Sequence, residues 1–100
     1  MLAKKHRTRD GKLILAICDD DLPGKRFADK DFQIDLTGDF YKGRKESEEE
    51  IKKTIDDAYI INAVGENCIE FLLRLNLVDR KNIIRIAGVP HAEAVIVREE

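Results

Sequence analysis

Two near-continuous apolar runs in the last third of the chain, separated by an apolar helical segment, limit the fold more than any other feature. The first run covers residues 59–64 and ends in Gly65, and the second covers residues 82–87 and ends in Gly88. Between them, residues 66–76 are apolar over more than half of a helical circumference, which is typical of a helix packed on a sheet. This order predicts a βαβ unit with parallel strands and a right-handed crossover.

A β-hairpin is expected at the start of the chain. Residues 2–8 and 12–18 flank an Asp-Gly pair, which favours a tight turn because both residues tolerate positive φ. The second segment is apolar on both faces and belongs inside the sheet, whereas lysine and arginine place the first near an edge. A short strand at residues 32–36 and a last antiparallel strand at residues 92–98 complete the predicted sheet.

Two main helices are predicted. Ser47 is followed three residues later by a glutamate, the spacing of a capping box, so the first helix should cover residues 48–57. The second is the apolar segment 66–76. With 100 residues, the chain has the size of one compact domain, taken as residues 1–100. The predicted fold class is α/β, with an α+β arrangement left open, and a mixed sheet of about five or six strands.

Charge is distributed unevenly along the chain. The first twelve residues hold five basic side chains against one acidic one, although the formal net charge of the chain is −2. The leading hypothesis is a non-catalytic binding module that contacts RNA or a ribonucleoprotein, with Phe40 and Tyr41 stacking on unpaired bases. In the alternative interpretation, these charges only protect a sheet edge. The predicted nucleic-acid-binding residues are Lys4, Lys5, Arg7, Arg9, Lys42 and Arg44.

A second hypothesis places binding of, or proton transfer on, a small anionic metabolite at the sheet edge where the two glycine turns would meet. Pro90 stiffens the predicted loop 88–91 and would hold the imidazole of His91 near that edge. Free amides at the start of the second helix would bind phosphate or carboxylate. Ordinary structural turns explain the same glycines without a ligand. The predicted binding residues are Gly65, Glu66, Asn67, Gly88 and His91, and the catalytic candidates are His91, Glu66 and Cys68.

Other chemistry is less favoured by the sequence. Cys68 shares a helical face with Leu72 and is expected in the core, and the run Asp19, Asp20 and Asp21 is interpreted as a solvated turn, with cation binding left open. No metal and no cofactor are predicted, and neither enzymatic activity nor the oligomeric state is decided. No apolar run approaches the about 20 residues that cross a bilayer. Together with two cysteines outside any paired motif, this predicts a cytoplasmic protein with no membrane partner.

Four segments, in matching order, resemble a known family. They are Ala3-Lys4-Lys5-His6-Arg7 with the following Asp-Gly turn, residues 36–43, residues 60–66 and residues 88–92. Together they are similar to an archaeal family of small uncharacterised proteins, family 424 among the domains of unknown function. The resemblance spans nearly the whole chain and implies an archaeal cytosolic protein. It brings no catalytic residue, because no activity is established for the family.

Overall fold

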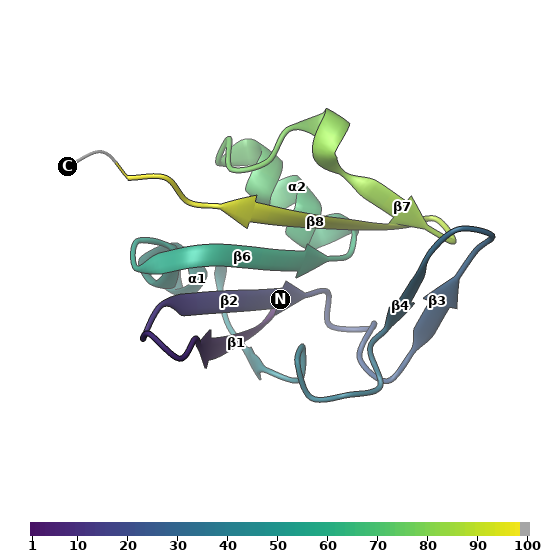
Figure 1. The fold of residues 1–100 in the computed structure, drawn as a ribbon, viewed down its shortest axis with the longest axis horizontal. Helices are drawn as coiled ribbons and strands as arrows, with labels where there is room; N and C mark the ends of the chain where they lie inside the picture. Colours follow the sequence, from purple (N-terminus) through teal and green to yellow (C-terminus); the bar gives the residue numbers. More distant parts are fainter. Residues whose placement is uncertain (99–100) are drawn as a thin grey trace.

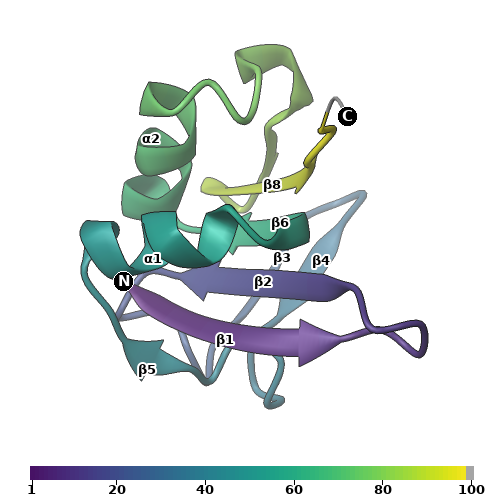
Figure 2. The same ribbon diagram turned by 90° about the vertical axis from the view of Figure 1, so that its left-hand side faces the viewer.

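The computed structural model describes residues 1–98, and in this range a six-stranded mixed sheet carries two α-helices on one face (Figures 1 and 2). The strand order is β5-β1-β2-β6-β8-β7, and within these residues β2 and β6 are the one parallel pair of neighbours. The predicted α/β class with a mixed sheet is confirmed. The strands are β1 (Leu2–Arg7), β2 (Leu13–Cys18), β5 (Arg44–Lys45), β6 (Ala58–Val64), β7 (Ile84–Ile86) and β8 (Val89–Val95).

The N-terminal hairpin forms as predicted. β1 and β2 pair antiparallel from Leu2 opposite Cys18 to Arg7 opposite Leu13. Gly11 in the connecting turn has a φ of 86°, a conformation that glycine adopts without a steric penalty. β2 is almost entirely buried, because β1 and β6 flank it and apolar clusters cover both of its faces.

The C-terminal βαβ unit is present with one strand inserted. β6, α2 (Glu66–Arg74) and β7 follow each other along the chain, and β8 pairs antiparallel with both strands. It follows that β6 and β7 are parallel but are not neighbours. The predicted loop 88–91 is wrong, because the turn before β8 consists only of Ala87 and Gly88, with φ of 50° and 82°. A two-residue turn of this kind folds a strand directly back onto its predecessor, so His91 lies inside β8.

Two short strands are not predicted from the sequence. β3 (Arg26–Ala28) pairs with β4 (Gln33–Asp35) in a separate two-stranded sheet. The strand predicted at residues 32–36 is therefore real but lies outside the main sheet. β5 pairs with β1, and no strand is predicted at this position from the sequence. With three and two residues, β3 and β5 are too short to show a period-two pattern in the sequence.

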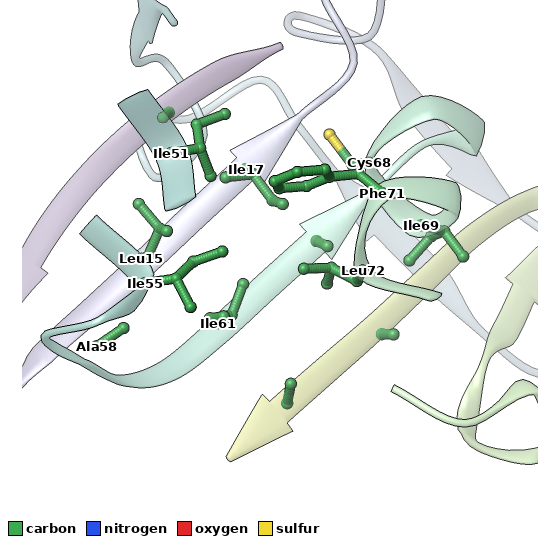
Figure 3. Packing of buried hydrophobic residues seen from close by; sticks show 14 of the residues in the cluster. Leu15, Ile17, Ile51, Ile55, Ala58, Ile61, Cys68, Ile69, Phe71 and Leu72 are labelled. Carbon is green, nitrogen blue, oxygen red and sulfur yellow. The ribbon is translucent and has the colours of Figure 1, made fainter. Parts of the chain in front are cut away.

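The main core lies between the sheet and the helices (Figure 3). α1 (Glu48–Ile55) begins at the predicted capping box and contributes Ile51 and Ile55 to this core. α2 contributes a wider apolar face that includes the fully buried Phe71 and Leu72. The wide apolar face predicted for the second helix is thus seen in the packing.

A smaller apolar cluster lies on the opposite face of the sheet, under the β3–β4 hairpin (Figure 2). It connects the ends of β2 and β6 to the segment between residues 22 and 41. Its buried members are Cys18, Leu22, Leu36 and Val64, and Phe27, Ile34, Tyr41 and Val89 pack around them. This cluster holds the loop that follows β4 close to β1.

Phe71 provides a test of the main core. Phe71→Ala leaves a cavity between α2 and the sheet, and should lower the free energy of unfolding by about 3–5 kcal/mol. Urea titration followed by circular dichroism measures this change. Phe32→Ala is the matched control, because Phe32 is 53 % exposed, and its substitution should change the free energy by no more than about 0.5 kcal/mol. Equal losses in the two variants would contradict the assignment of the core.

Candidate functional site

Four of the six predicted nucleic-acid-binding residues line one groove of about 670 Å³. The groove lies between β1, β5 and α1, which Figure 2 shows close together at one side of the sheet. Glu46 and Glu50 are its acidic side chains, and Glu50 is engaged in the cap of α1, where it accepts from the backbone N–H of Ser47 at 3.1 Å. The cations that line the groove are Lys4, Lys5, Lys42 and Arg44, joined by Lys53 from α1.

Contacts between β1 and the loop before β5 bring these cations together. The Nζ atom of Lys4 donates to the carbonyl of Asp39 at 2.8 Å, and Nε2 of His6 donates to the carbonyl of Phe40 at 2.9 Å. Gly43 lies directly against β1, since a Cβ atom there would come within 2.1 Å of the carbonyl oxygen of Ala3. Residues about 35 positions apart in the sequence are held side by side in this way.

The two aromatic residues predicted to stack on bases differ in their surroundings. The Phe40 ring stacks on the His6 imidazole, with ring centroids 4.3 Å apart and an interplanar angle of 7°, yet Phe40 remains 40 % exposed. Tyr41 packs against the smaller apolar cluster, and burial raises the pKa of its hydroxyl. Tyr41 is half-buried, and Phe40 is the more exposed ring. Phe40 stacks on His6, on the face of β1 opposite to the side chain of Lys5, and does not line the groove.

The remaining basic residues of the predicted set lie outside the groove. Arg7 continues along β1 and donates to the carbonyl of Gly11 at 3.0 Å, while Arg9 is exposed in the hairpin turn. Lys53 lines the groove although the sequence does not single it out. The one indication in the sequence is that Lys53 lies on the polar face of α1. Which lysines of this helix reach the groove depends on how the helix packs.

The second predicted site has a different outcome, because the protein itself occupies the start of α2. Asp19 follows β2 and is only 6 % exposed. Its carboxylate accepts hydrogen bonds from the backbone N–H groups of Asn67 at 3.0 Å and Cys68 at 2.9 Å. The Asp19 carboxylate thus fills the position that a phosphate would take at a helix N-terminus. The prediction that these amides are free is wrong.

The other residues of that predicted site do not converge either. The Arg85 guanidinium donates to the Glu66 carboxylate and to the carbonyl of Gly88, and this bonding holds the pKa of Glu66 below its ordinary value. His91 lies opposite Val64 and Ile84, and Val64 belongs to the cluster on the face away from the helices. His91 and the start of α2 therefore lie on opposite faces of the sheet.

The catalytic candidates lack an arrangement for nucleophilic chemistry. Cys68 is fully buried, and burial raises the pKa of its thiol, so it stays a neutral thiol. Burial also lowers the pKa of His91, partly offset by Glu93 on the same strand. Since His91 is on the other face of the sheet from α2, which carries Glu66 and Cys68, the three predicted catalytic residues do not form one centre.

The three consecutive aspartates point to different partners. Asp19 bonds to α2, Asp20 pairs with Lys45 at 3.3 Å, and Asp21 is exposed. Within residues 1–98, no three His, Cys, Asp or Glu side chains are grouped so that they could hold a metal ion. In the same part of the chain, neither helix has the length and apolar character needed to cross a membrane.

These features describe a small α/β domain with a basic groove at the β1–β5 edge of the sheet and a helix N-terminus that Asp19 closes at the ends of β2 and β6. The chain belongs to the DUF424 family of proteins of unknown function, whose model matches residues 6–97. Among curated proteins no sequence matches it. A crystal structure of an uncharacterized conserved protein from Methanopyrus kandleri is similar, with a TM-score of 0.79 and 27 % identity, over 99 % of this chain and 93 % of that one. This similarity agrees with the fold described above.

Asp19 is expected to be the most important polar side chain for stability. Asp19→Ala leaves two helix amides without their carboxylate acceptor, and should lower the free energy of unfolding by about 2–4 kcal/mol. Asp19→Asn keeps one acceptor oxygen and should lose about 1–2 kcal/mol. Urea unfolding at pH 7 measures both. Asp21→Asn, at the exposed neighbouring position, should stay within about 0.5 kcal/mol of the native chain, and an equal loss there would refute the role of Asp19.

His91 should make the protein less stable at mildly acidic pH. Burial lowers the pKa of its imidazole in the folded state below its ordinary value, so the unfolded chain binds the proton more readily. The contribution is fully present above the unfolded pKa and is lost as the pH falls through the folded pKa. Urea midpoints measured between pH 8 and pH 5 should fall less for His91→Gln than for the native chain. Parallel curves would contradict this assignment.

Proposed function

We propose that the protein is a non-catalytic module that binds single-stranded RNA, free or within a ribonucleoprotein, in the basic groove beside β1. The observation that carries this proposal is the gathering of Lys4, Lys5, Lys42 and Arg44 from two distant segments into one groove. Lysine and arginine contacts to phosphates supply most of the affinity of such modules. Five cations against two carboxylates make the groove positive, although the chain as a whole carries a formal charge of −2.

The backbone of β1 adds a neutral donor at the same place. The carbonyl of Met1 accepts from the N–H of Glu46 on the β5 side, so alternate residues of β1 direct their backbone groups to that side. β5 begins at Arg44 opposite Ala3, and the N–H of Lys5 therefore points outward beyond the first residue of β5. Backbone amides and lysine side chains together are common partners of phosphate oxygens.

Phe40 favours an unpaired nucleic acid over a duplex. Its ring is exposed, is stiffened by the stack on His6 and is two residues from Lys42. A flat exposed ring close to Lys42 along the chain can stack on a splayed base while the nucleic-acid backbone lies over the lysines of the groove. A paired helix hides its base faces and offers no such contact.

The alternative of a small anionic ligand at the two glycine turns is less well supported. Asp19 already satisfies the amides of α2, and Arg85 neutralises Glu66. The imidazole of His91 is on the opposite face of the sheet.

We also propose a cytoplasmic location and an archaeal source. The two buried, unpaired cysteines fit a reducing compartment, and the similar crystal structure is from Methanopyrus kandleri.

Charge reversal in the groove tests the proposal. The double variant Lys5→Glu with Arg44→Glu should weaken binding of a labelled single-stranded oligoribonucleotide at least about tenfold, and should reduce the dependence of affinity on salt. Fluorescence anisotropy titrations at several salt concentrations measure both effects. Phe40→Ala should weaken binding of the single-stranded ligand by about 1–3 kcal/mol and leave duplex binding unchanged.

A matched control separates the groove from the overall charge. The double variant Lys30→Glu with Lys81→Glu makes the same change in net charge at exposed positions outside the groove. Its affinity for the oligoribonucleotide should stay within about threefold of the native chain. Equal losses in the two double variants, or no binding at low salt, would refute RNA binding in the groove.

A further inference from the structure

The basic groove ends at a glutamate. Glu46 lies in the connection from β5 to α1 (Figure 2), and it lines both the groove and a neighbouring hollow of about 520 Å³. Six acidic residues, Glu46 among them, line this hollow against one basic residue, Arg74. Lys45 and the ammonium group of Met1 pair with Asp20 of the hollow, which still leaves the acidic groups in excess. The charge of the surface therefore changes from positive to negative at Glu46.

The carboxylate of Glu46 lacks a partner, although five cations line the same groove. Its backbone is fixed, because its N–H donates to the carbonyl of Met1 at 2.9 Å. The residue is half-buried, and among residues 1–98 its carboxylate forms neither an ion pair nor a hydrogen bond. Glu50, the other acidic residue of the groove, accepts instead from the N–H of Ser47 at 3.1 Å. A half-buried carboxylate that has lost part of its hydration is stabilised by a ligand that donates hydrogen bonds to it.

The change of charge decides which part of a nucleic acid can lie at this end of the groove. A phosphate beside Glu46 would meet a like charge, with the acidic hollow directly behind it. A base is neutral and avoids this repulsion, and its N–H groups are attracted to a carboxylate. The phosphates of a bound strand therefore lie over the cations, and a base is turned toward Glu46.

The lining of the groove suits a flat ring. Two of its residues, Ala3 and Gly43, are small and touch each other, since a Cβ atom at Gly43 would come within 2.1 Å of the carbonyl oxygen of Ala3. Lys5, Arg44 and Lys53 add aliphatic stems and a planar guanidinium group, which are common partners of the face of a base. A volume of about 670 Å³ is also in the range of sites that hold a small ligand.

We propose that the carboxylate of Glu46 selects a guanine base in the bound strand, an inference that rests on the RNA binding proposed above. Guanine is the RNA base whose pairing edge carries two adjacent donors, N1–H and the N2 amino group, and the two oxygens of a carboxylate accept both in parallel. Adenine and cytosine place an acceptor nitrogen beside their amino group, and uracil has one N–H between two carbonyls. Each of these bases therefore brings a lone pair against the second carboxylate oxygen, which disfavours it.

A cycle of one protein variant and one base analogue tests this contact. In fluorescence anisotropy titrations, one guanosine in the middle of an oligouridylate should tighten binding by the native chain at least about tenfold. Inosine at the same position lacks only the N2 amino group and should lose most of this gain. Glu46→Gln should remove the difference between guanosine and inosine. Its affinity for plain oligouridylate should not fall, because the substitution removes a negative charge from the groove.

Glu49→Gln is the matched control, since Glu49 is exposed on α1 and pairs with Lys52 at 3.6 Å outside the groove. It should keep the preference for guanosine, and far-ultraviolet circular dichroism checks that both variants are folded. A native chain that binds oligouridylate equally well with and without guanosine overturns the role of Glu46 and leaves RNA binding in place. A preference that survives Glu46→Gln, or a variant that loses affinity for every strand alike, also overturns it. A native chain that binds neither strand at low salt refutes RNA binding itself, and guanine selection with it.

Discussion

The hydrogen bonds from the first amides of α2 to the carboxylate of Asp19 hold the centre of this fold together. They join the end of β2 to the start of α2, across the end of β6, and so connect three central elements at one point. Gly65 makes the approach feasible. Its φ is 110°, and a Cβ atom there would lie 2.3 Å from Cγ of Asp19. A buried carboxylate that accepts two amide hydrogen bonds satisfies both its own charge and the helix dipole.

This internal cap also decides where an external anion can bind. A glycine turn that leads into a helix is a common phosphate site because its amides are free. Here the amides are already satisfied, and the nearby Glu66 is paired with Arg85. The basic groove lies elsewhere, at the edge of the sheet that β1 and β5 form. The cap that stabilises the fold thus lies at the ends of the central strands β2 and β6, whereas the proposed binding groove lies at the β1–β5 edge.

The sequence predicts those elements whose signal is local. The capping box at Ser47, the Asp-Gly hairpin and the apolar runs of β2 and β6 depend on residues close together in the chain. The position of β8 between β6 and β7 does not. It depends on the turn at Ala87, which has a φ of 50°. Alanine rarely adopts this conformation, so the sequence does not indicate a turn there. For the same reason, the sequence predicts a longer loop at Gly88-Val89-Pro90 in place of the two-residue turn.

The residues of the basic groove and of the Asp19 cap also could not be fully predicted from the local sequence. Lys4 and Lys5 are visible as part of a basic N-terminus, but their proximity to Lys42 depends on the contact of Gly43 with Ala3. Nothing local separates Asp19 from Asp20, since both are aspartates at the end of a strand. Their roles differ because β-strand alternation and long-range packing send one toward α2 and the other toward Lys45.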